Sequence, residues 1–363
     1  MTVMADGSQH PDLTDWLRQG VACGASDLHL VPGHPPMLRR HGELQAVGDA
    51  PVDSQYLLDT LKQLPTAQQW DEFQSSHNLD FSWRLTWDHT AYRFRVNFFR
   101  AGQDCGACFR IIPPEIPSFD WAGFPQPLAE TLTGFRNGLV LIAGVTGAGK
   151  TTTLAMLIDR LNQRGGKRII TIEEPIEYMF TRREHSVVTQ REVGTDVASF
   201  ADGLKYGLRQ DPDVILVGEI RDCETAQIAL SAAETGHLVF STLHTRDAKG
   251  AISRYTDLFA QSVQDEIRSQ LSMSLRAVVS QHLLPSNAPD SKRELALEVM
   301  FSNSPIAHAI RSGRLETIDN NILTGKAAGM MTLDESVKRL LQEGKITQEV
   351  AGNFLQDGRH RTR

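Results

Sequence analysis

The stretch GLVLIAGVTGAGKTTTLAMLID, from Gly138 to Asp159, constrains the fold more than any other part of the chain. Residues 144–151 match the spacing G-x-x-x-x-G-K-[ST] of a phosphate-binding loop. The apolar run 139–143 precedes the loop, and apolar residues at helical spacing follow it, which predicts a strand, a loop and a helix in that order. In this context such a loop binds the phosphates of a nucleoside triphosphate.

Each residue type in this loop has a physical role. Glycines at 147 and 149 allow backbone N–H groups to approach phosphate oxygens, and a helix that begins near Lys150 adds the positive end of its dipole. We expect Lys150 to reach the β- and γ-phosphates and the Thr151 hydroxyl to bind Mg²⁺. The predicted nucleotide-binding residues are Gly144, Val145, Thr146, Gly147, Ala148, Gly149, Lys150, Thr151 and Thr152.

Composition limits the classes of protein that fit this chain. Its 363 residues suffice for two domains with separate cores. A net charge of −7 provides no global basic field for nucleic acid. No apolar run approaches the ~18 residues of a membrane span, and the first residues lack the features of a signal peptide. With four scattered cysteines, the chain is predicted to be cytoplasmic, with no nucleic-acid partner and no direct membrane insertion.

A proline-rich stretch divides the chain. IIPPEIPSF, residues 111–119, has three prolines within five positions, which disfavours both helix and central strand. Before it, YRFRVNFFR alternates apolar and polar residues at strand period. After it, apolar runs alternate with helical patterns, the order typical of a parallel α/β sheet. We expect an α+β domain over residues 1–112, a linker over 113–124 and an α/β nucleotide-binding domain over 125–363.

The end of the second domain carries its own helix signals. Thr332 and Glu335 have the spacing of a capping box. Apolar residues follow on one helical face, and Gly344 is placed to end the helix. The sequence therefore predicts a C-terminal helical region.

Polar groups that follow apolar strands are the catalytic candidates, because the carboxyl ends of parallel strands converge on the ligand. Glu219 follows the apolar run 214–217 after one glycine, and a carboxylate there can polarise the attacking water or hold Mg²⁺ through its water shell. Glu219 is therefore the predicted general base and, with Thr151, a predicted metal-binding residue. Glu173 is the next candidate for the base.

The remaining candidates in this domain are Glu174, Glu177, His237 and His244. His244 follows an apolar strand and is placed to sense the γ-phosphate; the alternative is a structural histidine. For Glu177 the alternative is a solvated carboxylate. The sequence contains no N-K-x-D tetrapeptide for guanine, which favours ATP.

Four segments, AGVTGAGKTTTLA, TIEEPIEY, DPDVILVGEIRD and TGHLVFSTLHT, occur in this order and resemble the type II/type IV secretion ATPase superfamily. They are most similar to its type IV pilus retraction ATPases of the PilT type, where they correspond to the Walker A, Asp box, Walker B and His box. ASDLHLVPGHPPMLRRHGEL and YRFRVNFFR resemble that family's N-terminal domain. The resemblance implies a PAS-like α+β domain followed by a RecA-like P-loop ATPase domain with C-terminal helices.

The resemblance also implies an assembly and a task. Members form homohexamers in which arginines of one subunit's N-terminal domain complete the neighbour's site. By motif match these are Arg95 in FRVN and Arg110 in CFRII; the alternative is surface arginines on strand faces. The implied function is Mg²⁺-dependent ATP hydrolysis that powers pilus retraction and twitching motility. The implied partner is an inner-membrane platform protein, reached from the cytoplasmic face.

Two departures from the family pattern bear on the subtype. Glu174 stands where the Asp box usually has aspartate, so the side chain gains one methylene of reach. The segment AIRSGRLE from Ala309 keeps only the first three residues of A-I-R-N-L-I-R-E, and about one helical turn is missing. The alternatives are a type II secretion or pilus-extension ATPase, a RecA-like nucleic-acid translocase, and a non-catalytic nucleotide-binding regulator. A regulator would have lost the base, and Glu219 is present.

Overall fold

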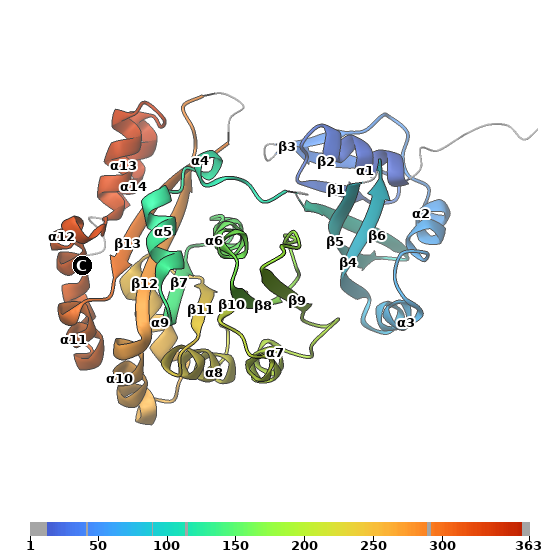
Figure 1. Cartoon of the computed structure of the whole chain (residues 1–363). Helices are drawn as coiled ribbons and strands as arrows, with labels where there is room; N and C mark the ends of the chain where they lie inside the picture. Colours follow the sequence, from blue (N-terminus) through green and yellow to red (C-terminus); the bar gives the residue numbers. More distant parts are fainter. Residues whose placement is uncertain (1–12, 41–42, 89, 113–114, 289–291, 358–363) are drawn as a thin grey trace, which may run out of the picture. The chain divides into compact units, whose positions relative to one another are not determined.

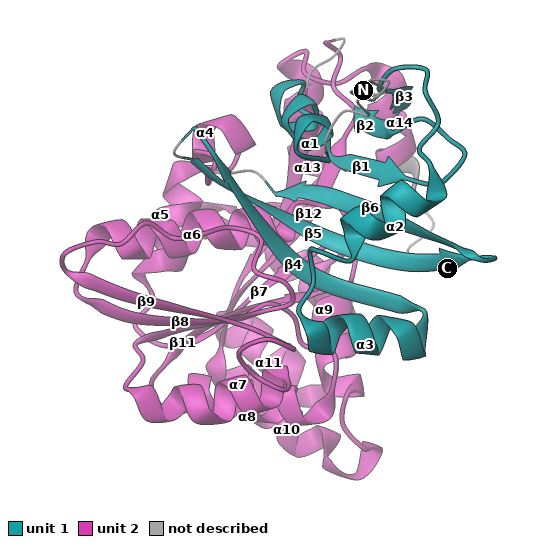
Figure 2. Cartoon of the chain, turned by 90° about the vertical axis from the view of Figure 1, so that its right-hand side faces the viewer, with its two compact units in different colours: residues 1–114 teal, residues 115–363 magenta. Residues whose placement is uncertain are grey.

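The computed structural model describes residues 13–40, 43–88, 90–112, 115–288 and 292–357. The chain divides into two compact units, residues 1–114 and 115–363, which Figure 2 draws in different colours. Each unit is built on a sheet of its own. Among the described residues, none of the helices combines the length and the apolar character needed to cross a bilayer.

The first unit contains a six-stranded antiparallel sheet in the order β3-β2-β1-β6-β5-β4. Its strands are β1 (Asp27–Leu30), β2 (Met37–Arg40), β3 (Glu43–Ala46), β4 (Asn78–Trp87), β5 (Thr90–Ala101) and β6 (Asp104–Ile112). One apolar core joins the sheet to three helices (Figure 1), which are α1 (Leu13–Ala22), α2 (Ser54–Leu61) and α3 (Ala67–Ser76). This unit is α+β, as predicted.

Strand β5 shows how the sequence pattern determines the two faces of this sheet. Phe94, Val96 and Phe98 are buried in the core shared with the helices. Arg95 and Asn97 alternate with them and therefore project from the opposite face. The predicted strand period is confirmed, and it leaves a polar sheet face that carries arginines.

The second unit is built on a seven-stranded sheet in the order β13-β12-β7-β11-β10-β8-β9. Strand β13 runs antiparallel to β12, and the other neighbouring strands are parallel. The strands are β7 (Gly138–Ala143), β8 (Lys167–Glu173), β9 (Ser186–Glu192), β10 (Val214–Val217), β11 (Leu238–Leu243), β12 (Leu275–Leu284) and β13 (Glu294–Phe301). The predicted α/β class is confirmed.

Helices cover both faces of this sheet (Figure 1). On one face Val140 and Ile142 of β7 pack in a core with α4 (Phe119–Ala122), α5 (Gln126–Gly134) and α6 (Lys150–Arg164). On the other face Leu139 and Leu141 share a core with α7 (Phe200–Gly207), α8 (Cys223–Glu234), α9 (Ala248–Asp257), α10 (Gln264–Ser274), α11 (Ser304–Ser312) and α12 (Ile318–Thr324). Because both faces are covered, the strands read as continuous apolar runs.

Helices α13 (Leu333–Gln342) and α14 (Gln348–Asp357) form the predicted C-terminal helical region and share a smaller core with Leu284 and Ala296. The predicted capping box is present, since Thr332 Oγ1 accepts from Glu335 N at 3.3 Å and the Glu335 carboxylate accepts from Thr332 N at 3.1 Å. Short 3₁₀ helices occur at η1 (Leu208–Gln210), η2 (Gln261–Val263), η3 (Leu315–Thr317) and η4 (Lys326–Ala328).

Candidate nucleotide-binding and catalytic site

The phosphate loop lies at the carboxyl end of β7, in the centre of the second sheet. Gly144 N donates to Leu243 O at 3.2 Å, which ties the start of the loop to the end of β11. Gly147 and Gly149 have φ values of 76° and 83°, a region that favours glycine. Helix α6 begins at Lys150, directly after the loop. The structure thus has the strand, loop and helix that the sequence predicts.

Lys150 is almost completely buried against this loop, with 8% of its surface exposed. Its Nζ donates to Gly144 O at 2.7 Å and to Val145 O at 3.1 Å. Burial lowers the pKa of Lys150, and the negative charge of Glu219 raises it in part. The ammonium therefore lies where a phosphate would neutralise its charge, and it is electrostatically coupled to the predicted base.

The residues around Lys150 differ in exposure. Val145, Thr146 and Gly147 are exposed, and Ala148 is buried. Thr151 and Thr152 are half-buried on the first turn of α6, where Thr152 Oγ1 lies 3.1 Å from the Tyr178 hydroxyl. This contact joins the helix that follows the phosphate loop to the segment that follows β8.

Glu219 lies just past the carboxyl end of β10, two strands from β7. Gly218 before it packs so closely that an added Cβ would lie 3.3 Å from Ile172 O. Gly218 N donates to Ile172 O at 2.8 Å, and Gly218 O accepts from Thr242 Oγ1 at 2.7 Å. The backbone that carries Glu219 is therefore fixed to both neighbouring strands, β8 and β11.

Arg221 holds the Glu219 carboxylate and was missed by the sequence analysis as a functional residue. Its Nη2 donates to Glu219 Oε1 at 2.5 Å, and its Nη1 donates to Glu174 Oε2 at 2.9 Å. These carboxylates raise the pKa of Arg221, and the largest cause is the hydrogen bond that Arg221 donates to Glu219. Glu174, at the position where the family usually has aspartate, thus contacts the same arginine as the predicted base. The available signal was the arginine two residues after Glu219.

Glu173 is the last residue of β8, and it is buried with 6% exposure. Its Oε1 accepts from Thr171 Oγ1 at 2.6 Å and from Gln190 Nε2 at 3.2 Å. Gln190 Nε2 also donates to Tyr178 O at 2.7 Å. Glu173 is therefore held in a network that also fixes the segment after β8. Glu177 lies in that segment and is half-buried. Burial raises the pKa of Tyr178, the hydrogen bond with Thr152 lowers it in part, and the negative charge of Glu177 raises it further.

The two candidate histidines lie at opposite ends of β11. His244 follows the carboxyl end, and its Nε2 lies 3.4 Å from Glu219 Oε2. His237 precedes the amino end, where its Nδ1 lies 3.0 Å from Ala232 O. Because β11 and β7 are parallel and in register, one strand length of about 20 Å separates His237 from the phosphate loop. The structure brings His244 to Glu219 and does not bring His237 there.

Arg95 and Arg110 lie in the first unit, directly opposite each other on β5 and β6. Their side chains project from the polar face of the sheet. Arg110 Nε donates to Asp27 Oδ1 at 3.0 Å, and Asp27 is buried. Arg95 Nε lies 3.7 Å from Asp80 Oδ1. The two arginines thus form an exposed pair on a rigid strand face, with Arg110 anchored by a buried carboxylate.

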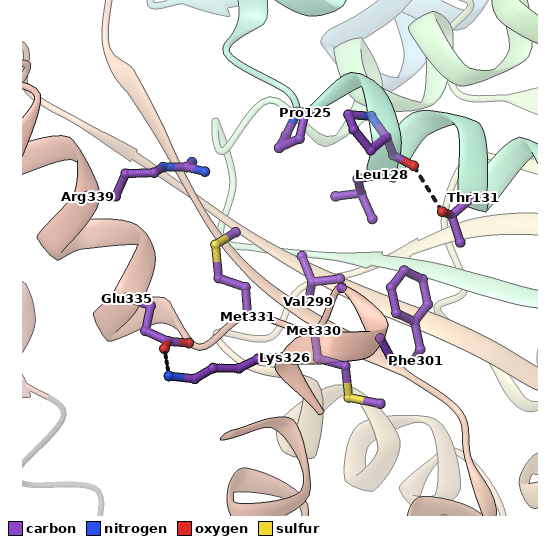
Figure 3. A pocket seen from close by; sticks show the side chains of 13 residues that line it. Pro125, Leu128, Thr131, Val299, Phe301, Lys326, Met330, Met331, Glu335 and Arg339 are labelled. Carbon is purple, nitrogen blue, oxygen red and sulfur yellow. Dashed lines mark hydrogen bonds and ion pairs between the residues drawn. The ribbon is translucent and has the colours of Figure 1, made fainter. Parts of the chain in front are cut away.

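A separate pocket of about 450 Å³ lies elsewhere in the second unit (Figure 3). Leu128 of α5, Val299 of β13 and Met331 contribute to its apolar lining. Lys326 and Glu335, which form an ion pair, also line it. The pocket shares no residue with the phosphate loop, so we do not assign it to the nucleotide site.

Within the second unit, a phosphate loop on a central strand is combined with a carboxylate and a histidine on the next strands of the sheet. This arrangement defines a P-loop ATPase. Residues 9–361 match the family described as Type II/IV secretion system protein, and the chain belongs to that family. The predicted family and the predicted ATPase class are confirmed.

Individual relatives refine this comparison. The chain is 38% identical to the type IV pilus retraction ATPase PilT of Pseudomonas aeruginosa, over 94% of this chain and 97% of that protein. A crystal structure of the pilus retraction motor PilT with bound ADP matches with a TM-score of 0.85 and 38% identity, covering 94% of this chain and 96% of that one. Type II secretion system protein E of Klebsiella pneumoniae is 49% identical, over 44% of this chain and 30% of that protein.

Proposed function

We propose that this PilT-like ATPase is a ring-forming motor that retracts type IV pili. The observation that carries the proposal is the similarity to PilT of Pseudomonas aeruginosa, which extends over nearly the full length of both chains. The similarity to the type II secretion protein is higher in identity but covers 30% of that protein. The match therefore favours retraction over secretion, because the retraction ATPase is matched over nearly its whole length.

In the proposed reaction, Glu219 takes a proton from the water that attacks the γ-phosphorus of ATP. The bond between the γ-phosphorus and the β–γ bridging oxygen breaks, and ADP and phosphate are the products. Lys150 binds the β- and γ-phosphates, and residues 144–152 of the phosphate loop hold the nucleotide. His244, 3.4 Å from Glu219 Oε2, reports the presence of the γ-phosphate. Glu173 is at the carboxyl end of β8, and Glu177 is in the segment that follows this strand. His237, which the sequence analysis included, precedes the amino end of β11 and takes no part in the proposed reaction.

Mg²⁺ is the proposed metal cofactor. The Thr151 hydroxyl and the Glu219 carboxylate are hard oxygen donors of the kind that this ion prefers. Glu219 keeps 17% of its side chain exposed, which leaves room for water between the carboxylate and an ion. Bound Mg²⁺ would neutralise charge on the phosphate oxygens.

The proposed assembly is a homohexamer in which Arg95 and Arg110 of one subunit complete the site of the next. Support comes from their position, because they are exposed side by side on a stiff sheet face rather than on a loop. A carboxylate beneath Arg110 keeps its guanidinium in a defined place. The proposed partner is a platform protein of the inner membrane, and the proposed location is the cytoplasmic face of that membrane.

The function is tested in a strain that makes pili but lacks its own retraction ATPase. Expression of this chain is expected to restore twitching and pilus shortening, whereas Glu219→Gln, expressed at the same level, is expected to restore neither. Rescue of pilus assembly in a strain that lacks the extension ATPase, without rescue of retraction, would support an extension motor instead. Stimulation of ATP turnover by DNA would support a nucleic-acid translocase.

A further inference from the structure

The β12–β13 hairpin contacts the phosphate loop with two side chains that no loop motif includes. Gln281 of β12 donates from Nε2 to Ala148 O at 3.3 Å. Arg293, one residue before β13, donates from Nη2 to Gly147 O at 3.2 Å. Both donors come from one hairpin, and both acceptors are successive backbone carbonyls of the loop.

The two contacts fix the orientation of two successive peptide planes. In a trans peptide the C=O and the following N–H point in opposite directions. A hydrogen bond from Gln281 to Ala148 O therefore directs the Gly149 N–H away from the hairpin. The hydrogen bond from Arg293 to Gly147 O fixes the peptide plane between Gly147 and Ala148 in the same way. The N–H of that plane, on Ala148, donates to Val145 O at 3.2 Å within the loop. Phosphate binding by such a loop depends on how its N–H groups are oriented.

The surroundings of Gln281 indicate that its side chain serves to make the hydrogen bond to Ala148 O. Its side chain is buried, with 1% exposure, and its Oε1 has no hydrogen-bond partner among the described residues. A buried amide oxygen without a partner destabilises the fold. The Nε2 bond to Ala148 offsets part of that cost. The backbone packs closely too, since an added Cβ on Gly144 would lie 2.8 Å from Gln281 O.

We propose that Gln281 and Arg293 are positioning residues of the phosphate loop. They hold the carbonyl groups of Gly147 and Ala148 away from the nucleotide's phosphates, and in this way they set the affinity for those phosphates. Neither side chain needs to touch the nucleotide. The inference rests on nucleotide binding by the phosphate loop and is independent of the choice of pilus retraction as the task.

The test measures the Kd for ADP and the kcat and KM for ATP with the purified full-length chain. Gln281→Met keeps the length of the side chain and removes the donor. Arg293→Ala removes the other donor, and Arg293→Lys restores one. Each lost hydrogen bond is expected to raise the Kd for ADP and the KM about three- to tenfold, with kcat within about twofold, because Glu219 and His244 keep their contacts. Arg293→Lys is expected to recover most of the affinity.

Two controls separate positioning from other effects. Lys292→Ala removes a neighbouring positive charge, which lies 4.8 Å from the centre of the Trp121 ring. Thr133→Val removes a buried bond to a backbone carbonyl, Ala129 O at 2.7 Å, in a distant helix. Both controls are expected to leave the Kd for ADP within about twofold. The effect of Arg293→Ala is expected to persist at about 0.5 M salt, where attraction between exposed charges is largely screened.

Unchanged ADP affinity in Arg293→Ala and Gln281→Met would overturn the proposal. So would an Arg293→Ala effect that equals that of Lys292→Ala and disappears at high salt. If Gln281→Met does not fold, the comparison of Arg293→Ala with Arg293→Lys still tests the proposal, because Arg293 is exposed and its replacement leaves the core unchanged. Failure to restore pilus retraction, with the affinity changes intact, would count against the proposed task alone.

Discussion

Arg221 and Glu219 are joined by a short hydrogen bond, in which Arg221 Nη2 donates to Glu219 Oε1 at 2.5 Å. The other oxygen of the same carboxylate lies 3.4 Å from His244 Nε2. Glu219 is thus oriented by Arg221, which is in the same segment after β10, and by His244 at the end of β11, while its backbone is fixed between β8 and β11. Orientation of this kind keeps a base in one position relative to its substrate.

The first prediction concerns this base. Glu219→Gln is expected to lower kcat for ATP by about 10²-fold or more, because an amide cannot accept the proton of the attacking water. Nucleotide binding is expected to remain intact, since Lys150 and the phosphate loop are unchanged. Steady-state turnover and ADP titration measure the two effects separately. Wild-type turnover in this variant would move the base to Glu173.

The second prediction concerns Arg221. Its side chain is 59% exposed, so its loss is expected to change stability by less than about 1 kcal/mol. Arg221→Ala is nevertheless expected to lower kcat about tenfold, because Glu219 loses the donor that orients it, with the Kd for ADP within about twofold. Arg209→Ala, an exposed arginine at the amino edge of the sheet, is the matched control. Equal turnover in both variants would make the Arg221 contact a surface ion pair without a role in catalysis.

The catalytic centre could be predicted where its chemistry is local in the sequence. Residues 144–151 specify a phosphate loop by spacing, and Glu219 and His244 each follow an apolar run directly. Strand direction could also have separated His237 from His244, because a residue before a parallel strand lies at the amino edge of the sheet.

Contacts between distant segments could not be predicted in the same way. Arg221 meets Glu174 across 47 positions, and Gln281 meets Ala148 across 133. Apolar patterns identify strands but do not determine which strand lies beside which. The order β13-β12-β7-β11 places β12 next to β7, and that neighbourhood decides which side chains can hold the phosphate loop.

The third prediction is a pH dependence of nucleotide binding. Burial lowers the pKa of Lys150, so the free protein begins to lose this proton at a lower alkaline pH than an exposed lysine would. Bound phosphate favours the charged form, so binding must take up a proton in that range, and ADP affinity is expected to fall as pH rises. Calorimetry in two buffers of different ionisation enthalpy measures this uptake. Binding without proton uptake up to about pH 10 would contradict it.

The same shift has a stability consequence with a definite sign. The unfolded chain binds more protons at Lys150 than the folded chain in the alkaline range, so this residue's contribution to stability rises with pH there. Below both pKa values, where the folded and unfolded chains are protonated at this residue, burial of the charged Lys150 costs stability. Lys150→Met is expected to remove this residue's part of the alkaline dependence of stability, which urea unfolding at several pH values measures.

The fourth prediction concerns assembly. If Arg95 acts on the neighbouring subunit, an equal mixture of Arg95→Ala and Lys150→Ala subunits is expected to regain activity. About a quarter of the interfaces would then combine an intact arginine with an intact lysine. Arg110→Ala mixed with Lys150→Ala is expected to behave likewise. ATP turnover of mixed rings, with ring formation checked by sizing, gives the answer. Intact rings without recovery would place both arginines outside the neighbour's site.

The last prediction concerns the short segment AIRSGRLE, and it separates ATP turnover from retraction. Helix α11 ends at Ser312, followed by Gly313 at φ 71°, and Arg314 N donates back to Ala309 O at 2.9 Å. Helix α11 therefore ends in a hydrogen-bonded turn at Gly313. Ile306, Ala309 and Ile310 are buried, so the helix is anchored against the core of the second unit.

Insertion of Asn-Leu-Ile-Arg after Arg311 would lengthen α11 by one turn, about 5.4 Å. The segment follows β13 and contributes none of the groups around Glu219, so ATP turnover is expected to stay within about twofold of the wild-type rate. Retraction speed in a strain without its own motor is expected to change, because the lengthened helix presents a different surface to the platform protein. Full retraction by the unmodified chain, unaffected by the insertion, would show that the missing turn does not determine the subtype.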